Sequence, residues 1–304
     1  MEKTRYIWLN GKLVDWDEAK VHVLTHALHY GSSVFEGIRC YETAKGPAIF
    51  RLKEHMERLQ RSAKVYMMDL PYTVEELCMA AVELVKANEL KECYIRPIAF
   101  QGVGEMGLQA RNPIQVAIAA WPWGPYLGEE GQRKGIRVRV SSYVRPPPNC
   151  LPMNVKAGGH YLSSILAKME ALRSGYDEAI MLDHRGFVSE GPGENVFIVR
   201  GSILLTPPLE ASILPGITRD TIMVIARDLG IQVKEENIAR GMLYEADEAF
   251  LTGTAAEVTP IREIDGIPVG NGQPGPITLK LQAEYKATVR GEKPQYQKWL
   301  TYVE

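Results

Sequence analysis

A lysine on an irregular loop is the residue of this chain best placed to act as a nucleophile. Lys156 follows the proline-rich stretch at residues 145–149 and precedes the glycine pair at 158–159. Glycines carry no Cβ atom, so a planar ligand can approach the lysine amine closely. An amine that is withdrawn from water loses part of its preference for the charged form and can attack a carbonyl carbon. The sequence therefore indicates a covalent role for Lys156, and a solvated loop lysine is the alternative.

Two acidic residues frame a tight turn about thirty residues after the lysine. Glu190 and Glu194 enclose a Gly-Pro-Gly sequence that follows a predicted strand at 178–183. A carboxylate presented by such a turn can hold a proton on a heterocyclic nitrogen. An ordinary polar hairpin is the alternative.

Two later segments have the features of anion sites. Residues 214–220 (LPGITRD) open a predicted helix, where free N–H groups and the Thr218 hydroxyl suit a phosphate. A plain capped helix start is the alternative. Thr254 and Glu257 match a capping box. Because Pro260 follows within a turn, we expect a tight turn at residues 253–257 rather than a helix.

The composition restricts the class of protein. The 304 residues suffice for two domains and a sizeable core. With 24% charged residues and a formal net charge of −2, the chain is unlike proteins that bind nucleic acid or anionic membranes. The first residues form no apolar export segment, and the four cysteines are scattered without a Cys-x-x-Cys pair. We therefore expect a soluble cytoplasmic protein without a metal site.

Hydrophobic periodicity predicts alternating strands and helices. In the first part we expect a hairpin at 7–13 that turns at Asn10-Gly11, helices at 52–63 and 73–88, and strands at 93–100 and 115–121. In the later part we expect helices at 162–172 and 222–229, and strands at 136–140, 179–182, 196–199, 203–205 and 249–251. These patterns predict a smaller N-terminal α/β domain at 1–120, a linker at 121–134 and a larger C-terminal α/β domain at 135–304. A cleft between two such domains is a common place for a small ligand.

Two motifs suggest other functions that the surrounding sequence does not support. Residues 102–107 fit G-x-G-x-x-G, but Asn112-Pro113 interrupts the helix that a dinucleotide site requires. His22, His26 and His29 have helical spacing, yet no carboxylate or cysteine nearby completes a metal site. We expect packed or hydrogen-bonded histidines and no nicotinamide cofactor.

In their order and spacing, the motifs resemble one family. They read YIWLNG at 6–11, HALHYG at 26–31, VFEGIR at 34–39, YIRP at 94–97, KAGG at 156–159, EG at 190–191, GEN at 193–195, LPGITR at 214–219 and GTAAE at 253–257. The chain is similar to the branched-chain amino acid aminotransferases, which are class IV enzymes that use pyridoxal 5'-phosphate. The resemblance implies an α+β fold of type IV, as in D-amino acid aminotransferase, with two α/β domains and a larger C-terminal pseudo-barrel.

The resemblance also implies a role for individual residues toward the cofactor. Lys156 would bind the cofactor aldehyde and later move a proton, Glu190 would pair with the ring nitrogen, and Tyr161 would donate to the phenolic oxygen. Arg58 would meet the phosphate together with the start of the 217–218 helix. The implied cofactor-binding positions are Arg58, Lys156, Tyr161, Glu190, Asn195, Leu214, Ile217, Thr218 and Thr254.

The substrate pocket implied by the resemblance is mainly apolar. Arg96 would accept the distal carboxylate of glutamate, and the Thr254-Ala255 turn would bind the α-carboxylate. The implied substrate-binding positions are Tyr30, Phe35, Gly37, Tyr94, Arg96, Met106, Leu108, Trp123, Tyr126, Thr254 and Ala255. Tyr30, Met106 and Leu108 would come from a neighbouring subunit, so a homodimer or a larger assembly of dimers is expected.

The implied reaction is a reversible ping-pong transfer of the amino group between L-leucine, L-isoleucine or L-valine and 2-oxoglutarate. A D-amino acid aminotransferase and an aminodeoxychorismate lyase of the same fold are the alternatives. Two positions depart from the family pattern. Pro192 removes a turn N–H that members usually have, and His160 stands where asparagine is common.

Overall fold

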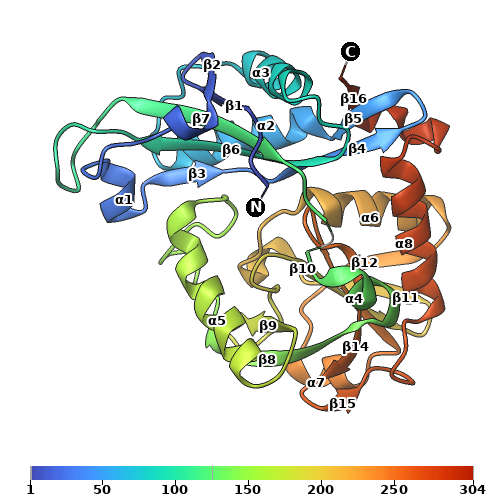
Figure 1. Cartoon of the computed structure of the whole chain (residues 1–304). Coiled ribbons are helices and arrows are strands. Elements are labelled where there is room, and N and C mark those ends of the chain that lie inside the picture. Colours follow the sequence, from blue (N-terminus) through green and yellow to red (C-terminus); the bar gives the residue numbers. More distant parts are fainter. Residues whose placement is uncertain (1, 125, 304) are drawn as a thin grey trace. The chain divides into compact units, whose positions relative to one another are not determined.

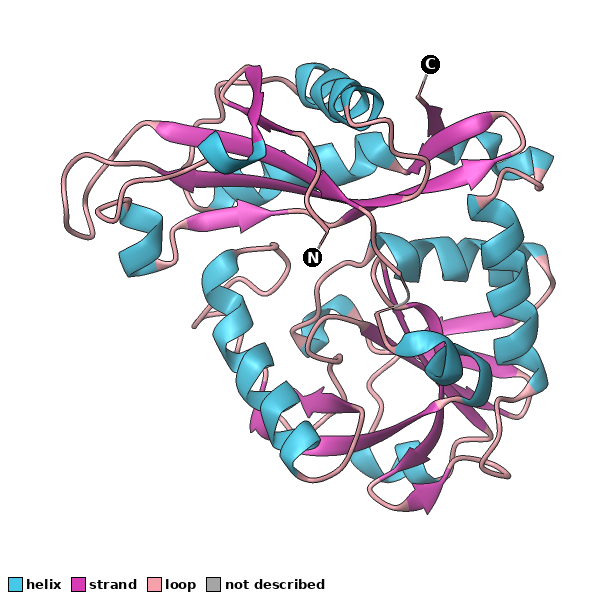
Figure 2. Cartoon of the chain, in the orientation of Figure 1, coloured by secondary structure: helices cyan, strands magenta, loops and turns pink. Residues whose placement is uncertain are grey.

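The computed structural model describes residues 2–124 and 126–303, which form two compact units. The first unit comprises Met1–Trp123, Val155–Gly159 and Thr288–Glu304, and the second comprises Gly124–Asn154 and His160–Ala287. Each unit contains helices and a sheet, which confirms the α+β class (Figures 1 and 2). The domain boundaries predicted around residues 121–134 stay a prediction.

The sheet of the first unit is antiparallel. Its strands run in the order β16-β5-β4-β6-β7-β1-β2, and β3 pairs with β6. Their bounds are β1 (Tyr6–Leu9), β2 (Lys12–Asp15), β3 (Ser33–Phe35), β4 (Ile38–Thr43), β5 (Gly46–Phe50), β6 (Cys93–Gln101), β7 (Ile114–Trp121) and β16 (Leu300–Tyr302). The predicted first hairpin is confirmed, because Asn10 and Gly11 turn between β1 and β2 with φ of 48° and 91°. Such left-handed values suit a two-residue hairpin turn.

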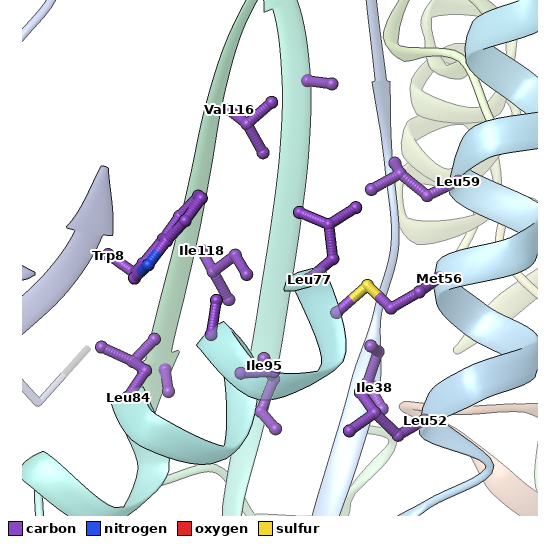
Figure 3. Close-up of a cluster of buried hydrophobic side chains, with 14 of the residues drawn as sticks. Trp8, Ile38, Leu52, Met56, Leu59, Leu77, Leu84, Ile95, Val116 and Ile118 are labelled. Atoms are coloured by element: carbon purple, nitrogen blue, oxygen red, sulfur yellow. The ribbon is translucent and has the colours of Figure 1, made fainter. Parts of the chain in front are cut away.

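Of the helices of the first unit, α2 (Leu52–Val65) and α3 (Val74–Ala87) pack on one face of this sheet. The unit also contains α1 (His26–Tyr30) and short 3-10 turns at Trp16–Glu18 and Pro294–Trp299. The α3 helix begins with the predicted capping box of Thr73 and Glu76. Figure 3 shows Met56 from α2 and Leu77 from α3 against the sheet residues Ile95 and Ile118.

The opposite face of the same sheet carries polar and aromatic side chains. Side chains alternate between the two faces along a strand. On β6, Ile95 is in the core, so Tyr94 and Arg96 lie on the opposite face. On β4, Ile38 is in the core, so Arg39 lies on the opposite face. This second face, which we call the functional face, carries the predicted substrate positions of β6.

The second unit has a mixed sheet. Its strands run in the order β12-β11-β10-β13-β14-β8-β9, and β15 pairs with β14. The pairs β11-β12, β8-β14 and β8-β9 are parallel, and the others are antiparallel. The bounds are β8 (Ile136–Val144), β9 (Glu178–Leu182), β10 (Asn195–Arg200), β11 (Ile203–Thr206), β12 (Gln232–Glu235), β13 (Glu248–Gly253), β14 (Glu257–Ile264) and β15 (Ile267–Pro268).

Five helices and two 3-10 turns accompany this sheet in the described residues. The helices are α4 (Gly128–Lys134), α5 (Tyr161–Arg173), α6 (Ile217–Asp228), α7 (Arg240–Tyr244) and α8 (Pro276–Val289), and the turns are Gly158–His160 and Leu209–Ala211. The α5 and α6 helices lie where the sequence predicts them. Within the described residues, none of these or the other helices combines the length and apolarity that crossing a membrane would require.

The apolar residues that predict α5 are exposed. The small residues Ala167 and Ala171 pack against Ala179 and Met181 of β9. Leu162, Ile165, Leu166, Met169 and Leu172 are instead 42–68% exposed. An exposed apolar stripe of this kind is a feature of surfaces that another protein covers.

Truncating one buried methionine should destabilise the first unit. Met56 is fully buried, so Met56→Ala leaves a cavity and should lower the free energy of unfolding by about 2–5 kcal/mol. Met79 on α3 is 64% exposed, so Met79→Ala should change it by less than about 0.5 kcal/mol. Urea denaturation of the two variants measures both values. Equal losses would contradict the core assignment.

Candidate active site

The backbone around Lys156 is held as a short extended segment beside β3. Ala157 pairs with Val34 in an antiparallel bridge, and the Phe35 N–H donates to the Lys156 carbonyl at 3.0 Å. The Lys156 N–H donates to the Ser62 hydroxyl of α2 at 3.1 Å. The neighbouring side chains Val155 and Ala157 are buried in the core of the first unit. The segment is therefore fixed on both sides of the lysine.

This pairing directs the lysine side chain away from the core. In an extended segment, alternate side chains point to opposite sides. Since Val155 and Ala157 point into the core, Lys156 points to the functional face. Its amine lies 5.0 Å from the centre of the Phe35 ring. The predicted nucleophile is thus held over an aromatic ring and is half-buried.

The functional face groups several predicted substrate residues around Tyr94. Its ring lies 5.3 Å from the Trp121 ring and 4.9 Å from the Trp123 ring. The Arg96 Nη2 donates to the Tyr94 hydroxyl at 3.0 Å, and the Arg96 guanidinium lies 4.8 Å from the Phe35 ring centre. Phe35, Tyr94, Arg96, Trp123 and Lys156 are therefore neighbours in the first unit.

Arg58 is anchored by a buried carboxylate. Glu36, directly after β3, is fully buried and accepts from Arg58 Nε at 2.6 Å and Arg58 Nη2 at 2.8 Å. It also accepts from His55 Nδ1 at 2.7 Å. Such two-pronged pairs fix an arginine in one orientation. The guanidinium predicted to meet a phosphate is therefore held by Glu36.

The charges of this cluster determine its protonation. Burial alone would raise the pKa of the Glu36 carboxyl, but Arg58 and His55 outweigh it and hold that pKa well below its usual range. Burial lowers the pKa of His55, and the nearby cations Arg58 and Lys156 add to this, whereas Glu36 opposes it. At neutral pH the cluster thus contains an ionised Glu36, a charged Arg58 and a neutral His55.

In the second unit, a buried network holds Glu190 by both carboxylate oxygens. The Arg145 Nη2 lies 3.0 Å from Glu190 Oε1. The Asn195 Nδ2 and the Leu214 N–H donate to Glu190 Oε2 at 3.0 Å and 3.1 Å. Arg145 also donates to the Gly191 carbonyl at 2.8 Å, so the turn that contains Pro192 is held through carbonyl groups. These donors favour the ionised form of the carboxyl group.

The second acid of the turn has the opposite character. Glu194 is buried, and its Oε2 accepts from the Gly193 N–H at 3.1 Å. Burial, together with the nearby carboxylates of Glu178 and Glu190, raises the pKa of Glu194 to about 8. The Glu194 side chain is therefore mainly neutral at pH 7.

The start of α6 has a close approach that only glycine allows. A Cβ atom on Gly216 would lie 1.9 Å from the Asn195 Oδ1. The next residues, Ile217 and Thr218, are buried in the first turn of the helix. The backbone N–H groups of a helix start are a favourable place for an anion.

The Thr254 segment is a turn, as predicted. Gly253 and Glu257 pair across β13 and β14, and residues 254–256 form the connection. Glu257 has a left-handed φ of 54°, which is typical of a three-residue hairpin loop. The capping-box alternative is wrong, because no helix begins at Thr254.

The remaining predicted positions lie in varied surroundings. Tyr161 is the first residue of α5 and is half-buried. The side chains of Tyr30, Met106, Leu108 and Tyr126 are 46%, 43%, 88% and 42% exposed. Tyr30 contacts the His26 ring at 4.5 Å between centroids. His26 itself is hydrogen-bonded to Ser32 and to the Gly107 carbonyl.

Sequence reasoning missed three residues that shape the site, namely Glu36, His55 and Arg145. Glu36 lies inside a recognised motif, but its partners Arg58 and His55 come from a helix some twenty residues later. Arg145 is the first residue of the proline-rich stretch at 145–149. A charged residue inside an otherwise apolar stretch was the available signal for Glu36.

Comparisons with known proteins agree with this geometry. The family model of the class IV amino-transferases matches residues 33–264. The branched-chain-amino-acid aminotransferase of Escherichia coli (strain K12) is 50% identical over 306 residues, which cover 99% of this chain and 98% of that protein.

Solved structures give the same result. The branched-chain amino acid aminotransferase of T.th. with pyridoxamine 5'-phosphate has a TM-score of 0.97 and 52% identity, with 100% of both chains covered. The same enzyme complexed with N-(5'-phosphopyridoxyl)-L-glutamate has a TM-score of 0.94 and 49% identity, again with 100% of both chains covered. The chain belongs to the branched-chain-amino-acid aminotransferases of the class IV aminotransferase family.

Replacing the buried carboxylate should change how stability depends on pH. Glu36 has a lowered pKa in the folded protein, so it binds its proton more weakly there than in the unfolded chain. Its contribution is therefore present above its ordinary pKa of 4.5 and is lost as the pH falls below that value. Glu36→Gln leaves Arg58 without its carboxylate and should cost about 3–5 kcal/mol at pH 7.

Chemical denaturation at pH 7 and at pH 4 measures this dependence. The difference in unfolding free energy between wild type and Glu36→Gln should become smaller at the lower pH. Glu54→Gln on α2, the helix that carries Arg58, is the control, because Glu54 is only partly buried and pairs with Arg51. A difference that grows toward pH 4 would refute the ionised Glu36.

Proposed function

We propose that this chain is an aminotransferase that exchanges the amino group between L-leucine, L-isoleucine or L-valine and 2-oxoglutarate, with pyridoxal 5'-phosphate as its cofactor. Family membership supports the reaction class, and the presentation of Lys156 supports the covalent role. The observation that carries the proposal is the presentation of Lys156, whose backbone is held by the pairing with β3 and whose amine lies 5.0 Å from the centre of the Phe35 ring. The D-amino acid and lyase alternatives are less favoured by the relatives.

Features of this chain fit the proposed cofactor. Pyridoxal phosphate supplies an aldehyde for the lysine amine and a ring that withdraws electrons from the bond to be broken. The Glu190 carboxylate is buried and contacted by the Arg145 guanidinium and the Asn195 amide, surroundings that suit the partner of a protonated ring nitrogen. Asn195 and Leu214 would keep this carboxylate in position. Tyr161 would donate its hydroxyl proton to the phenolic oxygen.

The phosphate would be bound by groups that are already oriented. Glu36 fixes Arg58, and the N–H groups of Ile217 and Thr218 lie at the start of α6. A helix start and an anchored guanidinium both favour a dianion. The Thr254 hydroxyl would complete this set.

Lys156 would have a second task after the amino acid binds. Its released amine would carry a proton between the substrate Cα and the C4′ atom of the cofactor. Substrate orientation would come from the Thr254-Ala255 turn, which would hold the α-carboxylate by N–H groups. Arg96 would bind the distal carboxylate of glutamate, and Phe35, Gly37, Tyr94, Trp123 and Tyr126 would contact the apolar side chains.

A homodimer, or a larger assembly of dimers, is part of the proposal. Exposed apolar side chains gather on α1 and the loop after β6, where Leu28 is 63% exposed and Leu108 is 88% exposed. Tyr30 and Met106 belong to the same segments, and we propose that they reach the pocket of a neighbouring subunit. A cytoplasmic location, predicted from the composition, completes the proposal.

Removing the lysine amine should abolish catalysis. Lys156→Ala should reduce transamination of L-leucine with 2-oxoglutarate by at least about 10⁴-fold, because both the covalent link and the proton carrier are lost. Lys64→Ala is the control, since Lys64 is exposed on α2. Steady-state rates of the two variants measure the loss, and near-normal turnover by Lys156→Ala would refute the catalytic role of Lys156.

A cofactor spectrum that responds to D-alanine alone would refute the proposed substrate class.

A charge on the exposed apolar surface should disrupt the dimer. Leu108→Asp should shift the protein to the mass of a single chain in light scattering, because a carboxylate would be buried without a partner. Met79→Asp is the control, since Met79 is equally apolar and 64% exposed but lies on α3. A wild-type protein that is monomeric at micromolar concentration would rule out the assembly.

A further inference from the structure

Arg96 is held against the functional face by one hydroxyl and two rings. Its Nη2 donates to the Tyr94 hydroxyl at 3.0 Å. Its guanidinium carbon lies 4.8 Å from the Phe35 ring centre and 5.2 Å from the Tyr94 ring centre. A cation over aromatic rings with one hydrogen bond is stabilised without any carboxylate.

Gly37 provides the space that this contact needs. A Cβ atom on Gly37 would lie 1.9 Å from the Tyr94 hydroxyl oxygen and 2.8 Å from the ring carbon that carries it. Real Cβ contacts are essentially never that short, so any larger residue at position 37 must displace the Tyr94 hydroxyl. Tyr94 is 5% exposed and packs against both Trp121 and Trp123, so its ring has little room to move.

The contact has opposite consequences for the two kinds of substrate. With an apolar side chain in the pocket, the guanidinium would face a group that offers no hydrogen bond, and the Tyr94 hydroxyl compensates for this. With a distal carboxylate, the same hydroxyl competes for Arg96. Arg96 can therefore be bound either to the Tyr94 hydroxyl or to a substrate carboxylate. A ligand shifts the equilibrium between these two arrangements only if its affinities for them differ.

We propose that the Tyr94 hydroxyl, lying in the space left by Gly37, restrains Arg96 and thereby sets the ratio of affinities for apolar and dicarboxylic substrates. This inference rests on the proposed function, which assigns Arg96 to the distal carboxylate. Its new part is that Tyr94 and Gly37 are positioning residues for Arg96 and determine selectivity through it.

Two unreactive acids test the inference by equilibrium binding. Calorimetry on cofactor-loaded protein gives the dissociation constants of glutarate, which has two carboxylates, and of 4-methylvaleric acid, which has one carboxylate and a branched apolar end. Tyr94→Phe removes only the hydroxyl. It should shift the affinity ratio toward glutarate by roughly tenfold, the usual effect of one hydrogen bond to a charged group. A uniform loss of affinity for both acids cancels in this ratio.

Substitutions at glycine positions test the space requirement. Gly37→Ala should shift the ratio in the same direction as Tyr94→Phe. Combining the two should leave the ratio within about twofold of Tyr94→Phe alone, because both act on one contact. Gly241→Ala is the control, since its Cβ would meet nothing within 4 Å, and it should leave the ratio unchanged.

The outcomes separate this inference from the proposed function. The restraint of Arg96 by Tyr94 would be overturned if the affinity ratio of Tyr94→Phe stayed within twofold of the wild-type ratio or shifted toward 4-methylvaleric acid. This test holds even if Gly37→Ala fails to fold. If the wild-type protein transaminates L-leucine while Tyr94→Phe gives either of these ratios, the restraint is overturned and the proposed function is kept. Wild-type protein that binds neither acid and leaves L-leucine unchanged would overturn both.

Discussion

The pairing of residues 155–157 with β3 is the constraint on which the site in the first unit depends. Val155 and Ala157 are buried in the core, and the Lys156 carbonyl accepts from the Phe35 N–H at 3.0 Å. The ammonium group of a loop lysine without such anchors would be exposed to solvent. Here the extended geometry leaves its side chain only one direction, toward the face that carries Tyr94 and Arg96. Packing of Val155 and Ala157 in the core on one side of the sheet therefore directs the Lys156 side chain to the functional face on the other side.

Arginine–carboxylate pairs fix the other charged groups. Glu36 orients Arg58 in the first unit, and Arg145 orients Glu190 in the second. In each pair both partners are buried, so each side chain is held in one orientation. Glu194 differs from both acids, because no cation in the described residues forms an ion pair with it at 4.0 Å or less and its pKa is raised to about 8. Charge at the proposed site is thus set by which acids have a guanidinium partner.

Local signals in the sequence predicted local structure well. The Asn10-Gly11 hairpin, the capped α3 helix and the strands β6 and β7 are all confirmed, because each depends on neighbouring residues. The turn at Thr254 was predicted for the same reason. Recognisable motifs also placed Lys156, Glu190 and Arg58 among the candidate residues.

Contacts between residues that are far apart in the sequence could not be predicted from these local patterns. No periodicity indicates that residues 155–159 belong to the first unit, since that depends on a bridge to Val34, more than a hundred residues earlier. The exposed stripe of α5 has the same helical spacing as a buried one, so spacing alone does not say which face is covered. The partners of Glu36 and the space that Gly37 leaves for Tyr94 likewise require side chains from distant strands and helices to be placed.

The proposed function depends most directly on a covalent bond between the Lys156 amine and the cofactor. Reduction of the pyridoxal phosphate-loaded protein with borohydride, followed by peptide mapping, tests it directly. We expect a single pyridoxyl group, on the peptide that contains Lys156. A pyridoxyl group on another lysine, or none at all, would contradict this expectation.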